Sequence, residues 1–403
     1  MRPSERPAIP RAVWMLGIVS LFTDMGSEIV HSLLPVLLAT TLGASMLTIG
    51  LIEGAAEATV LFTKVFSGWA SDALGRRKPL VLLGYGLAAA VKPLFPLAGS
   101  VGAVATARLL DRFGKGIRGA PRDALVGDIT PAAIRGAAFG LRQSMDTIGA
   151  VVGPLLAVVL MTAFAGDIRR VLWVAVLPGV VAVLLLATAV REPADTPART
   201  ARLPITREGL SRLGAPFWRL ALLGGLVALA RFSEAFLVLR ASERGLPTDW
   251  VPMVLVVMSV VYAASAYPAG WLSDRIPRAR LLAAGMFTLV LGDGLLAMDG
   301  GVALAFAGIA AWGLHMGLTQ GILASLVVDR VPAAYRATAF GMFNLVSGAA
   351  LLVASAGAGA LWQVAGPPAA FLAGAAMAAV AGVAALLARE HSSAIDPRHV
   401  ASP

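Results

Sequence analysis

Long apolar runs recur along the whole chain and are separated by short polar stretches. A helix that spans a bilayer needs about 20 mostly apolar residues. Twelve segments meet this requirement. The pattern therefore predicts an all-α membrane protein with twelve transmembrane helices, over 12–38, 47–69, 79–98, 101–120, 136–164, 170–190, 218–240, 250–271, 280–298, 301–327, 337–362 and 368–388.

One stretch between these segments is of a different kind. Residues 191–217 are rich in arginine and proline and contain no long apolar run, which is typical of a soluble linker. We therefore divide the chain into an N-terminal six-helix bundle over 1–190, a cytoplasmic linker over 191–217, and a C-terminal six-helix bundle with a short tail over 218–403.

Basic residues gather in every second loop. The chain has 33 lysines and arginines, and only Arg169, Arg170, Arg240 and Arg244 lie in loops that follow odd-numbered segments. Loops rich in lysine and arginine stay on the cytoplasmic side of a membrane. We expect a multi-pass protein of the cytoplasmic (inner) membrane with both termini in the cytoplasm.

Composition agrees with lipid as the solvent, since 58% of the residues are hydrophobic and only 14% are charged. The net charge of +10 does not indicate nucleic acid as a partner, because the basic residues lie in clusters between apolar runs. The chain has no cysteine and only four scattered histidines. This excludes disulfides and a thiolate metal site, and we expect no metal and no cofactor.

Two motifs occur twice along the chain. The sequence at 68–78, after the second segment, returns at 270–280, after the eighth, with an offset of 202 residues. The sequence at 128–140 returns at 329–341 with an offset of 201 residues. Two motifs at one offset predict a duplicated six-helix unit, and hence two pseudo-symmetric bundles. Transporters built in this way bind substrate near the midplane, between the halves.

The repeated loop carries a family resemblance. It resembles the signature that follows the second helix of the major facilitator superfamily, and its second copy resembles the degraded partner of that signature. The residues that match are Gly68, Asp72, Gly75, Arg76 and Arg77 in the first copy, and Gly270, Asp274 and Arg278 in the second. The resemblance implies the fold of twelve-helix proton-coupled exporters, and a loop that latches the halves together in the outward-facing state. Without the resemblance, the same basic residues could simply mark topology.

Two further motifs are similar to those of the family. Arg112-Phe-Gly-Lys115-Gly116 resembles the motif of the fourth helix, with Lys115 in place of the usual glutamine. Gly149, Gly153 and Pro154 resemble the fifth-helix motif of proton-coupled exporters, although the expected glycine pair is Ala157-Val158 here. Small residues followed by proline favour close helix packing and then a kink.

The first segment carries Asp24, Glu28 and His31, which lie on one helical face because their spacings are 4 and 3. Ionisable groups in hydrocarbon line a cavity or pair with one another. We interpret Asp24 and Glu28 as proton-coupling residues. The alternatives are a fixed ion pair with a basic residue of another helix, and a metal face of Asp, Glu and His.

The second, fourth and fifth segments also carry charged stripes, which a lipid-facing surface would not tolerate. We therefore expect an internal charge network in the N-terminal half. Further proton-coupling candidates are Asp111, Arg112 and Asp146, and cavity candidates are His31, Glu53, Glu57, Arg108, Lys115, Arg142 and Gln143. Structural pairing is the alternative for these groups.

Fewer charged residues lie in the second half. Arg231 and Glu234 are spaced for an i,i+3 pair on a helix, and His315 lies within a span. We expect Arg231, Glu234, His315 and Asn344 to reach the cavity as substrate contacts. For His315 the alternative is a hydrogen-bonded interior residue.

These features predict a secondary transporter that moves a small organic molecule by alternating access. We expect proton-coupled export, with the proton gradient as the energy source. We expect the protein to work as a monomer in contact with lipid. The alternative within transport is uptake or exchange of an organic anion, because several arginines could neutralise a carboxylate or phosphate. The two differ in whether those arginines stay unpaired in the cavity. A membrane enzyme or receptor is disfavoured, since the sequence contains no P-loop, metal-ligand cluster or catalytic triad.

Overall fold

The computed structural model describes residues 8–190, 205, 207–273, 275–331 and 335–387, and every regular element within them is helical. The first half contains α1 (Arg11–Val36), the π-helix η1 (Leu37–Thr41), α2 (Met46–Leu74), α3 (Lys78–Val91), α4 (Leu94–Leu97), α5 (Val101–Ile129), η2 (Ala132–Ile134), α6 (Arg135–Ala163), α7 (Ile168–Val174) and α8 (Val176–Ala189).

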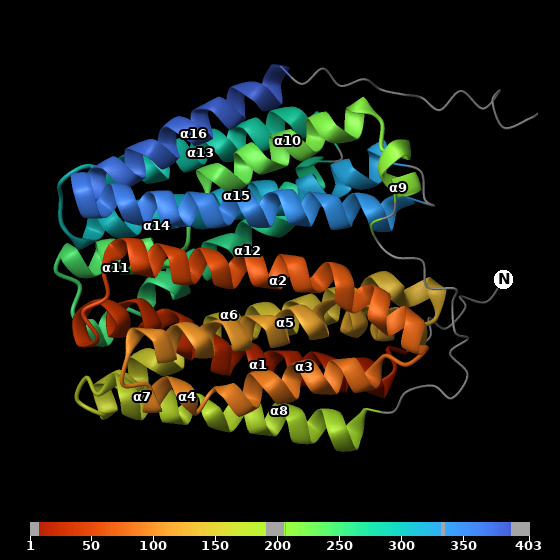
Figure 1. The fold of residues 1–403 in the computed structure, drawn as a ribbon, viewed down its shortest axis with the longest axis horizontal. Coiled ribbons are helices and arrows are strands. Elements are labelled where there is room, and N and C mark those ends of the chain that lie inside the picture. Colours follow the sequence, from red (N-terminus) through yellow and green to blue (C-terminus); the bar gives the residue numbers. More distant parts are fainter. Residues whose placement is uncertain (1–7, 191–204, 206, 274, 332–334, 388–403) are drawn as a thin grey trace, which may run out of the picture.

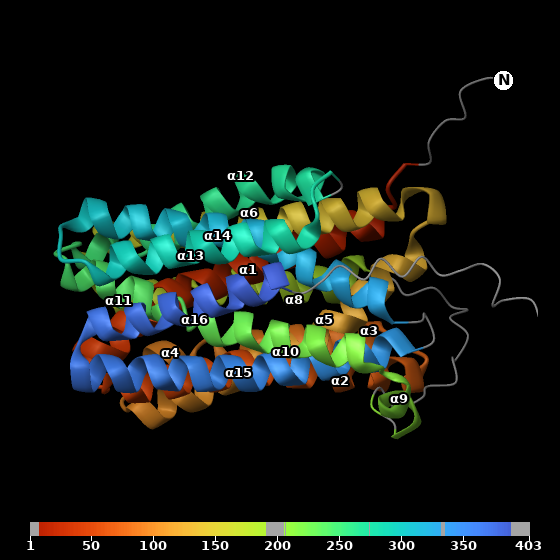
Figure 2. The same ribbon diagram turned by 90° about the horizontal axis from the view of Figure 1, so that it is seen from above.

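The second half contains α10 (Ala215–Ala230), α11 (Ala235–Glu243), η3 (Thr248–Trp250), α12 (Met253–Ser273), α13 (Arg278–Ala297), α14 (Val302–Arg330), α15 (Arg336–Ala365) and α16 (Pro367–Leu387). The short helix α9 (Arg207–Arg212) precedes it, within the predicted linker. Most of that linker lies outside the described residues. The two halves lie side by side as roughly parallel bundles (Figures 1 and 2).

The prediction of a twelve-helix membrane protein can be compared helix by helix. Eleven spans of the described chain are long and apolar enough to cross a membrane. The fourth predicted segment is the exception. It forms the 29-residue helix α5, which is long enough but carries many charged residues. Its charged side chains are mostly buried among the other helices, so α5 can span without presenting them to lipid.

Exposed tryptophans form two bands around the bundle. Trp14, Trp218 and Trp271 lie near the end at which α8 stops and α9 begins, which we call the linker end. Trp173 and Trp250 lie near the opposite end. Each is at least 40% exposed. Tryptophan is enriched where a membrane meets water, so exposed tryptophans near both ends agree with a bundle that spans the membrane.

Three of the four basic residues near the opposite end bind helix carbonyls. Arg169 donates to the carbonyls of Pro96 and Ala98 at 2.7 and 2.9 Å, at the end of α4. Arg240 and Arg244 donate to the carbonyl of Leu296 at 2.9 and 2.8 Å, at the end of α13. The last carbonyls of a helix have no partner within it and attract positive charge. Arginines therefore close the ends of equivalent helices in both halves.

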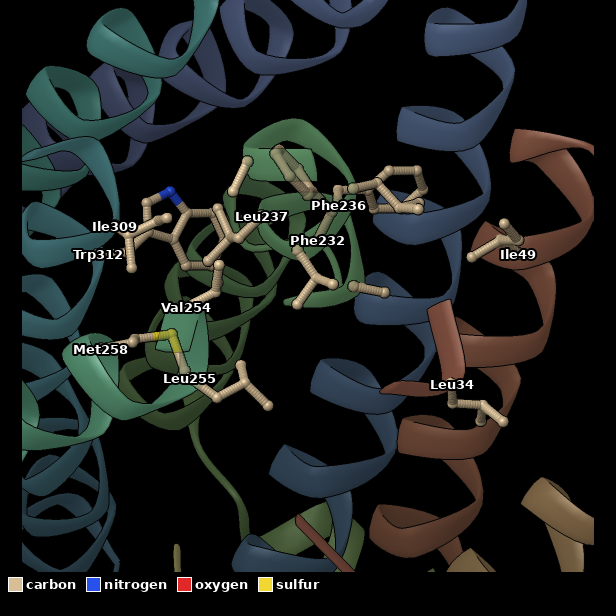
Figure 3. Packing of buried hydrophobic residues seen from close by; sticks show 14 of the residues in the cluster. Leu34, Ile49, Phe232, Phe236, Leu237, Val254, Leu255, Met258, Ile309 and Trp312 are labelled. Carbon is tan, nitrogen blue, oxygen red and sulfur yellow. The ribbon is translucent and has the colours of Figure 1, made fainter. Parts of the chain in front are cut away.

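Buried apolar residues join the two halves at the opposite end. One cluster contains Leu34 of α1, Ile49 of α2, and Phe236 and Leu237 of α11 (Figure 3). Toward the linker end, two further clusters of buried apolar residues each stay within one half. One lies within the first half and the other within the second. This cluster thus joins the halves at the opposite end, and Val65 of α2 also packs close to Gly341 of α15 nearer the linker end.

The seventh spanning segment is interrupted. Helix α10 ends at Ala230 and α11 begins at Ala235, and residues 231–234 between them are not helical. The Ser233 N–H donates to the Ser355 hydroxyl of α15 at 3.1 Å, and the Ser233 hydroxyl accepts from the Ala235 N–H at 3.2 Å. Irregular backbone at membrane depth is tolerated where it is buried in protein or lines a cavity.

Candidate functional site

A cavity of about 200 Å³ lies between the two halves. Both halves contribute to its wall, and the four residues of the break between α10 and α11 all line it. The lining residues are Glu28, His31, Glu57, Arg112, Lys115, Arg231, Phe232, Ser233, Glu234, Trp312 and Leu351. A midplane cavity between two repeats is where transporters of this architecture bind substrate.

The polar face of α1 borders this cavity. The Glu28 carboxylate lies 3.4 Å from Nδ1 of His31, and Nε2 of His31 lies 3.9 Å from the Glu53 carboxylate of α2. The predicted helical face therefore exists as a row of neighbouring side chains. No group of three or more metal-binding side chains occurs among the described residues, so the structure gives a metal face no support.

Behind the wall, two ion pairs connect helices of the first half. Arg108 of α5 and Glu53 of α2 approach to 2.6 Å, and both side chains are 1% exposed. Lys92 lies 3.6 Å from Asp111 of α5 and donates to the Ser27 hydroxyl of α1 at 3.1 Å. None of these residues lines the cavity. The structure thus places three of the candidates, Glu53, Arg108 and Asp111, in helix-to-helix pairs.

Arg112 belongs to the wall but has a partner there. One of its guanidinium nitrogens lies 3.6 Å from the Glu57 carboxylate of α2. Its Nε and second terminal nitrogen have no hydrogen-bond partner among the described residues. Arg112 therefore pairs with one carboxylate while keeping donors available beside the cavity.

Two lining cations and one lining acid are unpaired. Lys115 of α5 and Arg231 of the break form no direct ion pair with a described residue, and neither does Glu234. The expected i,i+3 pair between Arg231 and Glu234 is absent from the described contacts, and this expectation is wrong. The physical reason is the break at 231–234, because i,i+3 side chains meet only on a continuous helix.

A second charge cluster lies between the cavity and the linker end. Asp146 accepts from Arg142 at 2.6 Å, both on α6, and lies 3.6 Å from Arg122 of α5. Arg142 also donates to Gln143 at 3.0 Å. Nearer α1, Arg118 lies 3.8 Å from the Asp24 carboxylate. The four candidates Asp24, Arg142, Gln143 and Asp146 are thus gathered in one network.

Three members of this network, and one member of a buried ion pair, were not predicted from the sequence. Asp123 belongs to the network because its carboxylate lies 3.2 Å from Arg122 and 3.6 Å from Arg142. Arg122 and Asp123 lie beyond residue 120, where the predicted fourth segment ended, whereas Arg118 lies inside that segment but was not among the predicted site residues. Their helical spacing from Arg112 and Lys115 was the available signal. Lys92 stands alone in an apolar run, so only its packing against α1 and α5 reveals its partners.

The glycines of the fifth-helix motif lie directly against α1. A Cβ atom at Gly149 would come within 2.6 Å of the Leu21 carbonyl and 3.1 Å of the Asp24 Cβ. A Cβ atom at Gly153 would come within 2.6 Å of the Met25 carbonyl and 2.9 Å of the Glu28 Cβ. Helix α6 runs unbroken through Pro154. The motif therefore packs α6 onto the two acidic turns of α1.

The repeated loops differ between the halves. Gly75 ends α2 with a φ of 62°, a conformation that favours glycine, and Gly68 packs near Ala120 of α5. Arg77 pairs with Asp72 and, at 3.3 Å, with Asp128 of α5. These contacts stay within the first half, and the Arg76 side chain is exposed. In the second copy, Gly270 faces open space, Arg278 begins α13, and Asp274 lies outside the described residues.

The remaining candidates of the second half do not line the cavity. His315 of α14 is fully buried, and its Nδ1 lies 2.8 Å from the Gly285 carbonyl of α13. This geometry matches the alternative of a hydrogen-bonded interior histidine. Asn344 of α15 is half-buried and is not among the lining residues.

Comparisons with known proteins agree with this architecture. The chain is 31% identical over 386 residues to an uncharacterized MFS-type transporter of Methanocaldococcus jannaschii, covering 93% of this chain and 94% of that protein. An uncharacterized protein of Mycobacterium tuberculosis is 28% identical over 366 residues, covering 89% of this chain and 88% of that protein.

Solved structures share the fold at low sequence identity. The human organic anion transporter MFSD10 aligns with a TM-score of 0.68 at 17% identity, over 94% of this chain and all of that chain. The nucleoside transporter NupG aligns with a TM-score of 0.77 at 15% identity, over 94% and 99%. A POT family transporter in complex with 5-aminolevulinic acid aligns with a TM-score of 0.77 at 14% identity, over 94% and 96%.

The sequence profile of the Major Facilitator Superfamily matches residues 16–258 and 220–402, which together cover nearly the whole chain. With the two six-helix bundles and the midplane cavity, this match establishes the family. The chain belongs to the major facilitator superfamily of membrane transporters.

Proposed function

We propose that this transporter exports a small organic molecule with an acidic group, in exchange for protons. The observation that carries the substrate class is the pair of unpaired cations in the cavity, Lys115 from the first half and Arg231 from the second. An anionic group held between them would contact both halves at once. Binding would then be sensitive to the relative position of the halves, as alternating access requires.

The three arginine candidates of the first half are already paired. Arg108 is taken by Glu53, Arg112 by Glu57, and Arg142 by Asp146. A buried cation without a counter-ion is costly, and a substrate carboxylate or phosphate would offset that cost. This arrangement favours an acidic substrate over a purely cationic one.

Glu234 extends the proposal to zwitterions. It lines the same cavity and has no ion-pair partner among the described residues. A substrate with a carboxylate and an amine could place its acid on Lys115 and Arg231 and its amine on Glu234. Each charged end would then meet a group of opposite sign.

The proton would be carried by Asp24 and Glu28. Glu28 lies at the cavity and Asp24 lies one turn nearer the linker end, beside the charge cluster of α5 and α6. The close packing of Gly149 and Gly153 against these turns couples their surroundings to the position of α6. The direction we propose, export, rests on the resemblance of this motif to that of proton-coupled exporters.

The linker end would face the cytoplasm because basic residues gather there. Part of the apolar cluster that joins the halves lies at the opposite end, and this supports a conformation that would take substrate from the cytoplasm. The proton gradient would supply the energy, and no cofactor enters this scheme.

The substrate class is tested by binding to purified protein in nanodiscs. The probes are 5-aminolevulinate, levulinate and pentylamine, which carry a zwitterion, an acid only and an amine only on similar chains. We expect both acids to bind and to lose at least tenfold in affinity in Lys115→Gln and Arg231→Gln. Arg219→Gln, an exposed change on α10, should bind as wild type does. Tighter binding of pentylamine than of levulinate, or equal binding by all variants, would refute the acidic-substrate proposal.

Coupling is tested by flux of 5-aminolevulinate in proteoliposomes, with a pH-sensitive dye enclosed. An inward proton gradient should drive export of the probe, and export should fall at least tenfold in Asp24→Asn or Glu28→Gln. Probe flux that does not change with the pH gradient would remove proton coupling from the proposal. Probe movement in the same direction as the protons would replace export by uptake.

A further inference from the structure

One buried acid of the second half has no place in the mechanism above. Asp293 lies on α13 and is 0% exposed. Its Oδ1 accepts a hydrogen bond of 2.7 Å from the indole N–H of Trp312 on α14. Its Oδ2 has no hydrogen-bond partner, and the carboxyl forms no ion pair with any described residue. This is the setting of a carboxyl group that is buried without compensation.

Aromatic side chains surround this carboxyl. The ring of Phe232, in the break between α10 and α11, packs against Trp312 and Phe371 at centroid distances of 5.4 Å each. On α16, Gly374 packs directly against the carboxyl and the Phe232 ring. A Cβ atom there would lie 2.7 Å from Oδ2 of Asp293 and 2.8 Å from the Phe232 ring. The pocket around Asp293 is therefore closely fitted and apolar.

Few charged groups face Asp293 from the packed elements. Helix α14 carries His315, but this side chain is bound to the Gly285 carbonyl, and the break carries Arg231, which lines the cavity; neither forms an ion pair with Asp293. Helices α16 (Pro367–Leu387) and α12 (Met253–Ser273) contain no lysine, arginine, aspartate or glutamate. An ionised carboxyl at this position would thus lack a counter-ion, which is costly in a low-dielectric interior.

Two of the surrounding rings also belong to the substrate cavity. Phe232 and Trp312 both line it and pack against each other (Figure 3), and Trp312 also donates its hydrogen bond to Asp293. Phe232 lies in the non-helical break that is hydrogen-bonded to Ser355 of α15. A change in the relation of the halves that moves this break would open a route for water to the carboxyl.

We propose that Asp293 is a second proton-binding site of this transporter, which holds a proton while the halves are sealed at the opposite end and releases it when Phe232 and Trp312 move apart. The proposal rests on the proposed function in assigning protons to the transport cycle. It adds a site in the second half, away from Asp24 and Glu28. The first half would then not carry all of the coupling.

The sign of the pH effect follows from linkage. The conformation described here would bind one proton more, at Asp293, than a conformation in which water reaches this carboxyl. Acid should therefore favour the sealed conformation, and its population should fall as pH rises. For one proton, the ratio of the two conformations changes by at most about tenfold per pH unit.

The chain is well suited to a direct test because it has no cysteine. Spin labels at Leu74→Cys and Ile276→Cys would report the distance between the two halves at the linker end. These are equivalent positions of the repeated loops, and their side chains are 60% and 37% exposed. Electron-electron resonance of this pair between pH 5 and pH 9, without substrate or gradient, measures the two populations.

We expect the labelled parent to shift from the linker-end-open distance toward a shorter one as pH rises. Asp293→Asn keeps an oxygen that can accept the hydrogen bond from Trp312, but the amide cannot ionise. The variant should therefore keep the linker-end-open distance to higher pH. Its ratio of the two conformations should change less with pH than that of the parent, by up to tenfold per pH unit. Trp312→Phe removes the donor but keeps the acid, so its response to pH should remain. Asp24→Asn is the control for the response that comes from the first half.

A pH response in Asp293→Asn equal to that of the parent would overturn the proposal, and would leave Asp293 as a residue that only positions Trp312. In that case Trp312→Phe, not Asp293→Asn, would alter the distances. Because no substrate is present, this result is independent of the binding and flux experiments that test the proposed function.

Discussion

The buried pair between Arg108 and Glu53 should be the most sensitive ionic contact of the first half. Their charged atoms lie 2.6 Å apart and both side chains are 1% exposed. The Glu53 Oε1 and the Arg108 Nε have no other hydrogen-bond partner among the described residues. Glu53→Gln removes one charge and leaves the guanidinium buried without compensation. Loss of one member of such a pair costs about 3–5 kcal/mol.

The size of this effect can be separated from that of an ordinary ion pair. The pair between Arg170 and Asp167 is 3.0 Å long, but its side chains are 70% and 40% exposed. Arg170→Gln should therefore cost about 1 kcal/mol or less. Replacement of both buried partners, in Glu53→Leu with Arg108→Met, should recover most of the stability, because apolar side chains of similar size suit this interior.

Thermal unfolding in detergent, followed by the fluorescence of the eight tryptophans, measures the stability of the wild type, the two single variants and the double variant. Glu53→Gln should lower the midpoint by about 5 °C, and Arg170→Gln by about 1 °C, given the slope expected for a large chain. Equal midpoints for these two variants would refute the reasoning that burial decides the cost. A double variant less stable than Glu53→Gln would contradict it as well.

Three further outcomes follow from local geometry. Gly153→Ala places a Cβ atom within 2.6 Å of a backbone carbonyl of α1, so it should cost about 1–3 kcal/mol and slow transport, whereas Gly140→Ala, on the same helix with open space, should be neutral in both assays. Gly75→Ala forces a side chain into a φ of 62° and should lower the free energy of unfolding by about 1 kcal/mol, which appears as a lower unfolding midpoint. Arg169→Ala frees two carbonyls at the opposite end and should raise hydrogen exchange there, and Arg170→Ala should not.

Hydropathy was sufficient to predict the helical framework. The length of each apolar run predicts a membrane-spanning helix, and the two repeated motifs indicate the duplication. Neither inference needs knowledge of tertiary contacts. Helix α5 shows the limit of this reasoning. Its apolar residues predicted a span that ended at 120, but the helix continues to Ile129, because charged residues can extend a membrane helix where other helices cover them.

The partners of charged residues could not be predicted from the sequence. Spacing indicated correctly that Glu28 and His31 are neighbours, since they lie on one helix. The partner of Arg108 is 55 residues away on α2, and many acids of the first half were equally suitable by sequence. The expected pair of Arg231 and Glu234 is wrong because spacing assumes a continuous helix, and the break reflects packing against α15.

The four basic residues outside the basic loops show both kinds of information in one feature. Their scarcity predicted the orientation of the chain, because charge distribution along a sequence needs no fold to be read. The role of three of these residues is visible only in the tertiary structure. Arg169, Arg240 and Arg244 bind the carbonyls of helix ends that are distant in sequence.

The sequence by itself thus determined the number of segments, their duplication, the family resemblance and the rows of charge along single helices, all of which are local or periodic properties. Tertiary structure alone decided which charges pair, which stay open in the cavity, and that the solitary Asp293 meets Trp312. The reason is physical: a buried charge is tolerated or not according to its neighbours in space, and in a helical bundle those neighbours come from other helices.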